Sequence, residues 1–262
     1  MKIEKERLDV LLVEQGLTVS RSNAQALVLA GEVRVNSKPA SKPGMKIPRD
    51  SKIELISRAP YVGRGGYKLA QALDDFAFDV TDLVCADVGA STGGFTDVLL
   101  QRGARRVYAI DVGYGQLDWK LRNDERVVVM ERTNARYLER LPEQVDFTSV
   151  DVSFISLKLI IPKVTNWMSA GGQIIALIKP QFEAGPEKVE KGGVIRKEEV
   201  HRNVLEDIFH WSISRKLYPT GLVPSPIKGA SGNQEFLILL NPKRECLIDI
   251  EEAINRCFRQ VT

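Results

Sequence analysis

Two lysines and two acidic residues occur where they could jointly activate a hydroxyl group. Asp151 follows an apolar run in SVDVSFISL, Lys179 follows another in IIALIKPQF, and Glu235 begins the last run in GNQEFLILL. Lys68 lies on a helix that enters the same region. If the last strand is antiparallel to the others, its start meets their carboxyl ends, and the four side chains converge. Such a set can orient a weakly acidic hydroxyl for attack on an electrophile, whereas separate strand-end salt bridges are the structural alternative.

A glycine turn precedes a helix in DVGASTGGFTDVLL, residues 87–100. Its spacing is GxxxGG rather than GxGxxG, and no GK[ST] follows, which disfavours dinucleotide and nucleoside-triphosphate binding. Asp111, at the end of the next apolar run, is placed to accept hydrogen bonds from ribose hydroxyls. The turn therefore predicts a cofactor loop, and a purely structural turn is the alternative.

The elements that position these residues alternate between strand and helix. Strands are expected at 84–88, 107–111, 127–130, 147–150, 173–178 and 235–240, with helical segments between them. This alternation is typical of an α/β fold with a doubly wound parallel sheet. Ligands of such sheets bind at the carboxyl ends of the strands, where the predicted residues lie.

The first 60 residues predict a separate small module. Leu8, Leu11 and Leu12 indicate a helix over 6–15, and a second helix capped by Ser20 or Ser22 ends at Gly31. Alternating residues around Val33 and over 52–56 then indicate a small β-hairpin structure. Residues 1–60 carry a net charge of +4, against −1 for the rest of the chain. A local basic excess favours contact with a polyanion, although a solvated charged surface is the simpler alternative.

Composition excludes several classes of protein. Hydrophobic residues make up 44% of the 262 residues and charged residues 27%, as in a soluble protein with a core. The sequence has no signal peptide and no long apolar run, so we expect a cytoplasmic protein without a membrane partner. The three cysteines form no CxxC pair and only two histidines are present, so neither a disulfide framework nor a metal site is expected.

Two resemblances make the interpretation specific. The run from Arg7 to Ile47, RLDVLLVEQGLTVSRSNAQALVLAGEVRVNSKPASKPGMKI, resembles the αL RNA-binding domain of ribosomal protein S4. The motifs RGGYKL, DVGASTGGFTD, DVGYGQL, DVSFISL, IKPQFEAG and SPIKGASGNQEFL are similar to those of the TlyA group of FtsJ-like ribosomal RNA 2′-O-methyltransferases, often labelled hemolysins. The resemblance covers nearly the whole chain. It implies a Rossmann-like class I methyltransferase sheet behind a small α+β RNA-binding domain, and methylation of cytidine in small- or large-subunit rRNA.

The family resemblance also implies roles for individual residues. Its Lys-Asp-Lys-Glu tetrad matches Lys68, Asp151, Lys179 and Glu235, with Lys179 nearest the hydroxyl as its base or electrostatic orienter. The cofactor S-adenosyl-L-methionine would be bound by Asp87, Gly89, Ala90, Gly93, Gly94, Phe95, Asp111 and Asn134. Ribosomal RNA, free or within ribosomal subunits, is the implied partner, and its contacts in the first module would be Arg7, Arg21, Ser22 and Lys42.

Four further residues are candidates for RNA contact because of their positions. Arg64 lies between glycines, and Arg132 and Arg136 follow the third strand near the cofactor edge, where they could hold phosphates. Phe154, three residues after Asp151, could stack on a nucleotide turned out of its helix, or could be an ordinary core residue.

The expected domain boundaries are an S4-type domain over 1–58, a linker over 59–67 and the methyltransferase domain over 68–262. Three other functions stay open. The chain could be membrane-active, could be an RNA-binding assembly factor without turnover, or could methylate a base nitrogen or a small molecule. DVSF at the fourth strand end disfavours the last, because amino-methylating enzymes usually carry an Asn/Asp-Pro-Pro-aromatic run there.

Overall fold

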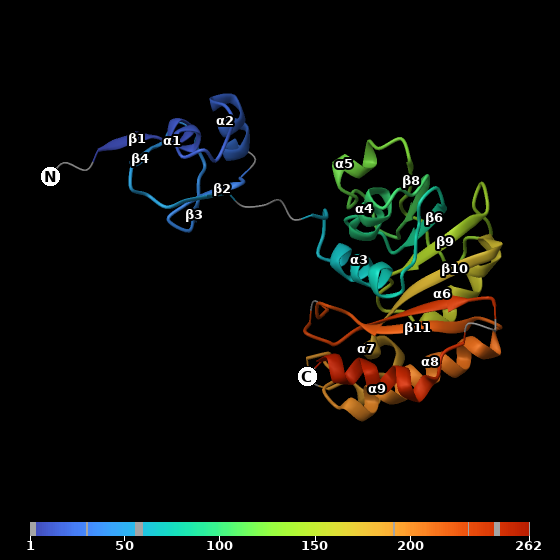
Figure 1. Cartoon of the computed structure of the whole chain (residues 1–262). Helices are drawn as coiled ribbons and strands as arrows, with labels where there is room; N and C mark the ends of the chain where they lie inside the picture. The colour runs from blue at the N-terminus through green and yellow to red at the C-terminus, as the bar shows by residue number, and fades with distance from the viewer. Residues whose placement is uncertain are drawn as a thin grey trace. The chain divides into compact units, whose positions relative to one another are not determined.

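The computed structural model describes residues 4–29, 31–55, 60–190, 192–229, 231–243 and 247–261. The chain forms two compact units, residues 1–60 and 61–262 (Figure 1). Five residues named in the predictions lie outside the described residues. They are Ile56 in the expected second hairpin strand, Ser57, Arg58 and Ala59 at the expected domain boundary, and Cys246.

The first unit packs two helices against short strands. The helices are α1 (Leu8–Glu14) and α2 (Arg21–Leu29), and the strands are β1 (Lys5–Arg7), β2 (Val33–Val35), β3 (Lys38–Pro39), β4 (Lys46–Pro48) and β5 (Ile53–Leu55). The first helix begins two residues later than predicted, because residues 5–7 pair with β4. As predicted, Ser20 caps the second helix, accepting a hydrogen bond from the Asn23 N–H.

The second unit is built on a seven-stranded sheet in the order β11-β12-β10-β9-β6-β7-β8. Its strands are β6 (Val84–Val88), β7 (Arg106–Ile110), β8 (Val127–Met130), β9 (Val145–Val150), β10 (Met168–Ile178), β11 (Tyr218–Pro224) and β12 (Phe236–Asn241). Strand β12 pairs antiparallel with both neighbours, and the other pairings are parallel. The α/β doubly wound fold and the antiparallel last strand are confirmed.

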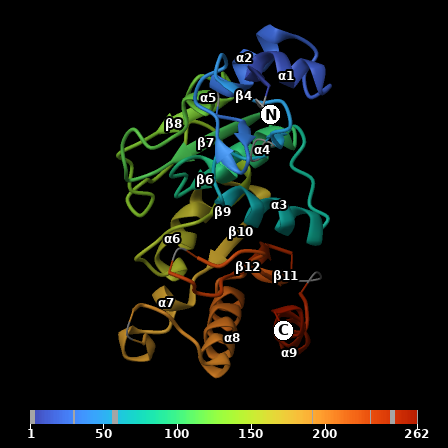
Figure 2. The same cartoon turned by 90° about the vertical axis from the view of Figure 1, so that its left-hand side faces the viewer.

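Helices cover both faces of this sheet. They are α3 (Gly65–Asp75), α4 (Gly94–Gln101), α5 (Trp119–Arg122), α6 (Leu157–Val164), α7 (Pro180–Glu183), α8 (Glu198–Ser214) and α9 (Ile250–Val261), with short 3-10 turns at Thr165–Trp167 and Pro186–Lys188. Side chains of α6, α8 and α9 join one hydrophobic core and those of α3, α4 and α5 join another. Figure 2 shows α3 and α6 on either side of strands β9 and β10.

Strand β11 was not predicted from the sequence. Its residues, YPTGLVP, carry two prolines and a glycine, which normally mark loops. Proline is tolerated here because β11 is the edge strand and pairs only with β12. Gly221 is needed because a Cβ atom there would collide with the Phe76 ring.

The second half of the expected linker is an integral part of the second unit. Helix α3 begins at Gly65 rather than near Lys68, and the Val62 N–H donates a 3.0 Å hydrogen bond to the Asp97 carboxylate of α4. Glycines permit this packing, since a Cβ on Gly66 would overlap Tyr61 and one on Gly94 would lie 2.8 Å from the Gly66 nitrogen. The glycine-rich composition therefore reflects close packing, where the sequence had suggested a linker.

Candidate functional site

The glycine turn lies where the sheet's strand order reverses. Strand β6 is flanked by β7 on one side and β9 on the other, so the crevice at its carboxyl end is a topological switch point. Gly89 follows β6 at φ +88°, and a Cβ there would collide with the Asp151 carbonyl. Backbone atoms of the first and fourth predicted strands thus meet at this point, as the Asp151 N–H also donates to the Val88 carbonyl at 2.8 Å.

A cavity of about 380 Å³ opens beside this turn. Three predicted cofactor residues, Gly89, Asp111 and Asn134, contribute to its lining. The Asp111 carboxylate accepts backbone hydrogen bonds from Ser91 at 2.8 Å and Gly113 at 2.6 Å. These bonds fix the carboxylate at the cavity wall, and its remaining lone pairs can accept from ribose hydroxyls.

A smaller cavity of about 160 Å³ shares Gly89 and Asp151 with the first. Its lining adds three other predicted cofactor residues, Ala90, Gly94 and Phe95, together with Lys68. Two adjacent cavities therefore lie beside the turn, one lined by Asp111 and the other by Lys68, and Asp151 lines both.

Two predicted cofactor residues lie under the turn and line neither cavity. Gly93, at φ +94°, is required because a Cβ there would collide with Leu121 and Leu117. Asp87 is fully buried and accepts hydrogen bonds from Thr96 Oγ1 at 2.7 Å and Ser149 Oγ at 3.2 Å. Burial raises the pKa of Asp87 to about 7, partly opposed by the Thr96 hydrogen bond. In this structure both residues shape the turn from beneath.

The candidate tetrad forms two ion pairs. Lys68 Nζ lies 2.5 Å from Glu235 Oε2, and Lys179 Nζ lies 2.6 Å from Asp151 Oδ1. Both lysines and Glu235 are more than nine-tenths buried, and Asp151 is about one-fifth exposed. Lys68 and Asp151 line the same small cavity, so each pair contributes one side chain to its wall. The structure brings the four side chains to one edge of the sheet, as the predicted antiparallel last strand requires.

Ser153 belongs to this cluster and was missed from the sequence. Its hydroxyl accepts a 2.8 Å hydrogen bond from Lys179 Nζ. A lone serine in a loop carries no sequence signal of its own. Its position two residues after Asp151 could, however, have suggested that both side chains face the same site. Glu183 was missed in the same way, and its carboxylate accepts hydrogen bonds from Ser156 and Leu157 in the loop that follows Ser153.

The predicted RNA-contact residues of the second unit are exposed. Arg64 is exposed just before α3. The Arg132 guanidinium lies 4.1 Å from the centre of the Tyr114 ring, and that of Arg136 lies 5.8 Å from the Tyr137 ring. Phe154 is 90% exposed and borders the larger cavity, so it is not a core phenylalanine.

In the first unit, a buried carboxylate organises two of the predicted RNA contacts. Asp9 is fully buried and pairs with Arg7 at 2.9 Å and Arg21 at 3.1 Å, while Gln25 donates at 2.9 Å. The arginine side chains remain about half exposed. These hydrogen bonds, led by that of Arg7, hold the pKa of Asp9 well below its usual range. The other two predicted contacts, Ser22 and Lys42, are exposed.

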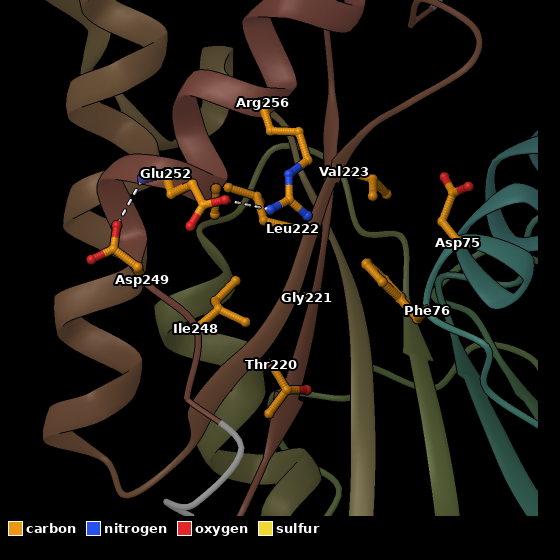
Figure 3. A pocket seen from close by; sticks show the side chains of 11 residues that line it. Asp75, Phe76, Thr220, Gly221, Leu222, Val223, Ile248, Asp249, Glu252 and Arg256 are labelled. Carbon is orange, nitrogen blue, oxygen red and sulfur yellow. Dashed lines mark hydrogen bonds and ion pairs between the residues drawn. The ribbon is translucent and has the colours of Figure 1, made fainter.

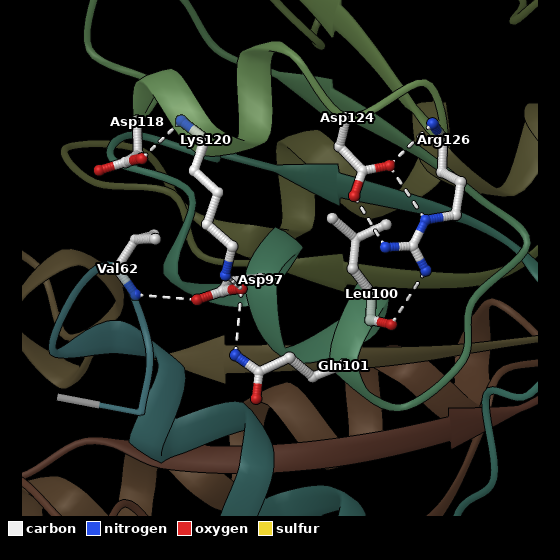
Figure 4. A network of polar contacts seen from close by, with 8 residues as sticks. All are labelled: Val62, Asp97, Leu100, Gln101, Asp118, Lys120, Asp124 and Arg126. Carbon is white, nitrogen blue, oxygen red and sulfur yellow. Dashed lines mark hydrogen bonds and ion pairs between the residues drawn. The ribbon is translucent and has the colours of Figure 1, made fainter. Parts of the chain in front are cut away.

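The segment before α3 is tied to the cofactor side of the second unit by Asp97 (Figure 4). This almost buried carboxylate accepts from the Val62 N–H, from Gln101 at 3.1 Å and from Lys120 at 3.4 Å. Because Asp97 lies in the first turn of α4, directly after the glycine turn, the network fixes the start of that helix.

Another cavity, of about 430 Å³, contains none of the predicted site residues (Figure 3). It lies between the end of α3, strand β11 and helix α9, with Phe76, Thr220 and Arg256 in its wall. No helix in the described part of the chain is long and apolar enough to cross a membrane. Over the same residues, no group of three or more His, Cys, Asp or Glu side chains could hold a metal ion.

Comparison with known proteins agrees with this architecture. The family model for FtsJ-like methyltransferases matches residues 61–242, and the S4 domain model matches residues 6–53. The Bacillus subtilis protein YqxC, provisionally named an rRNA methyltransferase, is 46% identical over 97% of this chain and 95% of its own. The Mycobacterium tuberculosis 16S/23S rRNA (cytidine-2′-O)-methyltransferase TlyA is 40% identical over 98% of each chain. A solved Streptococcus thermophilus structure, provisionally named a hemolysin, is 43% identical and covers 99% of this chain and 98% of its own, with a TM-score of 0.74.

The fold and the two family matches identify an S-adenosylmethionine-dependent methyltransferase with an S4-type RNA-binding domain. The chain belongs to the FtsJ-like methyltransferase family and, within it, to the TlyA group. The resemblance found in the sequence motifs is therefore confirmed.

Proposed function

We propose that this protein transfers a methyl group from S-adenosylmethionine to a ribose 2′-hydroxyl of ribosomal RNA. The observation that carries the proposal is the proximity of two ion pairs, Lys68–Glu235 and Lys179–Asp151, which contribute Lys68 and Asp151 to the wall of one cavity beside the glycine turn. Single strand-end salt bridges are common, but two that each place a side chain on one cavity beside a predicted cofactor loop support a reaction site.

Lys179 is the residue proposed to act on the hydroxyl. Among the described residues, its ammonium group has two polar partners, Asp151 and Ser153, and an ammonium has three N–H donors. The third donor can bind the hydroxyl oxygen, and its charge would stabilise the negative charge that develops on that oxygen. As the O–CH3 bond forms, the S–CH3 bond would break and the hydroxyl proton would pass to solvent water. Asp151 holds Lys179 in place. Lys68 lines the small cavity together with Asp151, and Glu235 pairs with Lys68 and so holds it there.

The residues around the larger cavity suit the cofactor. Asp111 would accept hydrogen bonds from its ribose, Asn134 would lie near its adenine, and Gly89 leaves the backbone open where a side chain would block it. S-adenosylmethionine supplies an activated methyl group on a sulfonium, which becomes a neutral thioether when the methyl leaves. The protein's part is to hold the acceptor oxygen in line and to stabilise the charge that develops on it.

Ribosomal RNA, free or within subunits, is the proposed partner, and the cytoplasm the proposed location. An RNA-binding domain over residues 1–58 would supply Arg7, Arg21, Ser22 and Lys42 as contacts. Arg64, in the segment 59–67, and Arg132 and Arg136, in the catalytic domain over 68–262, would add further contacts. The name of the M. tuberculosis relative supports cytidine as the nucleotide and both subunits as substrates.

The decisive experiment locates the transferred methyl group. Purified protein is incubated with methyl-labelled S-adenosylmethionine and unmethylated bacterial ribosomal subunits, and the RNA is digested to nucleosides for mass spectrometry. We expect a 2′-O-methylated cytidine. Label on a base would contradict the proposal. Lysis of membranes by the purified protein without cofactor, together with no RNA methylation, would favour the membrane-active alternative.

A further inference from the structure

Phe154 has an unusual backbone and an unusual exposure for a phenylalanine. Its φ is +63°, a region that bulky L-residues rarely adopt, and its side chain is 90% exposed at the rim of the larger cavity. Such a conformation costs about 1–3 kcal/mol and persists only where neighbouring contacts enforce it. Neighbouring contacts must therefore hold Phe154 in this conformation.

Helix α7 supplies these contacts. The Phe182 ring lies 5.0 Å from the Phe154 ring, centre to centre, at an interplanar angle of 47°. Next along the helix, Glu183 accepts hydrogen bonds from Ser156 Oγ at 2.6 Å and from the Leu157 N–H at 2.8 Å. Phe182 thus contacts the aromatic ring, and Glu183 holds the Ser156 side chain and the Leu157 backbone, two and three positions after Phe154.

The same helix begins directly after Lys179. The Phe182 N–H donates to the Lys179 carbonyl at 2.9 Å, and the Lys179 ammonium binds Asp151 and Ser153 at the start of the Phe154 loop. The loop from Asp151 to Leu157 is therefore held at both ends by the segment from Lys179 to Glu183. This closed set of contacts fixes the Phe154 ring relative to the Lys179 ammonium.

We infer that Phe182 and Glu183 are positioning residues that hold Phe154 as a stacking platform for the base of the target nucleotide, at a fixed distance from Lys179. This inference rests on the proposed function. It also narrows the substrate class to a nucleotide that is unstacked from its neighbours, because a base within a helix cannot place its face on an exposed ring. The base then lies on Phe154 while its own ribose reaches Lys179.

A double-mutant cycle on the full-length protein tests this coupling. Glu183→Gln, Phe154→Ala and the double variant are compared for kcat and KM with unmethylated ribosomal subunits, alongside S-adenosylmethionine affinity and thermal stability. Glu183→Gln replaces one acceptor oxygen by an amide nitrogen, so one of the two part-buried hydrogen bonds to the carboxylate is lost, and we expect kcat/KM for RNA to fall about tenfold. The double variant should be no worse than Phe154→Ala, and cofactor affinity should stay within about twofold.

Two further variants make the result unambiguous. Glu187→Gln removes an exposed carboxylate from the adjacent turn and should leave kcat/KM unchanged. Phe182→Leu removes the ring without touching the hydrogen bonds and should also lose its effect in the Phe154→Ala background. The inference would be overturned if the losses of kcat/KM in the single variants multiplied in the double variants. It would also be overturned if cofactor affinity fell by the same factor as kcat/KM. If the wild-type protein places no label on ribose, the proposed function fails instead, and the two failures are thus distinguished.

Discussion

Lys68 and Glu235 lie 167 positions apart in the chain, yet their side chains meet at 2.5 Å with both groups almost completely buried. Helix α3 brings the lysine to the sheet edge, and the antiparallel direction of β12 brings the glutamate to the same edge. Charges are rarely buried unless they are paired, so each group depends on the other.

This dependence predicts that stability and activity can be separated. Lys68→Ala leaves Glu235 buried without its partner and should lower the free energy of unfolding by about 3–5 kcal/mol. The Lys68→Met/Glu235→Gln double variant removes both charges and should regain most of that loss, while methyl transfer stays absent. Denaturant unfolding and a methyl-transfer assay measure the two effects. Recovery of activity in the double variant would exclude a reaction role for the pair.

Lys179→Ala should lower the rate of methyl transfer by at least about 10²-fold, because the donor and charge at the acceptor oxygen are lost. RNA affinity should change little, since the lysine is buried and the predicted phosphate contacts lie elsewhere. Single-turnover kinetics and filter binding report these quantities, with Lys188→Ala, an exposed lysine, as the matched control. Equal losses of rate and RNA affinity would favour an RNA-binding factor without turnover.

The pKa of Asp87, raised to about 7 by burial, predicts an unusual pH dependence of stability. An unfolded aspartate loses its proton near pH ~3.9, so between that pH and about 7 the native state holds a proton that the unfolded state lacks. The contribution of Asp87 to the free energy of unfolding therefore falls as pH rises through this window, by about 1.4 kcal/mol per unit. Asp87→Asn should flatten this slope in denaturant titrations. An unchanged slope would show that Asp87 is ionised throughout.

Whether RNA affinity rises or falls when the Asp9 charge is removed distinguishes two roles for this carboxylate. If this carboxylate only adds negative charge beside the RNA-contact arginines, Asp9→Asn should tighten RNA binding. If it fixes Arg7 and Arg21 in place, as its hydrogen bonds indicate, the substitution should weaken binding by about 1 kcal/mol, roughly fivefold. Affinity for ribosomal RNA, measured at several salt concentrations, decides between them. Asp50→Asn, which removes an exposed acid from the same unit, should not weaken binding.

The sequence alone was sufficient for the strands of the second unit other than β11, for the glycine turn at the switch point and for the meeting of the four candidate tetrad side chains at one sheet edge. Apolar runs with period two or with no period indicated the strands, and because parallel strands end at one sheet edge, Asp151 and Lys179 had to share that edge. The pairing of β9 with β10, which the structure shows, makes them neighbours. Local capping chemistry was equally readable, as Ser20 illustrates.

Other features depended on contacts between distant segments. Strand β11 exists because an edge position tolerates its prolines, and residues 61–67 are packed because their glycines meet α4 and Tyr61. Two single residues also show that burial could not be predicted from the sequence. Asp87, predicted to bind the cofactor, is buried under the turn, whereas Phe154, which could have been a core residue, is exposed. Spacing determines which residues share an edge, but burial and side-chain direction are decided only when the layers pack, because they depend on atoms supplied by the rest of the chain.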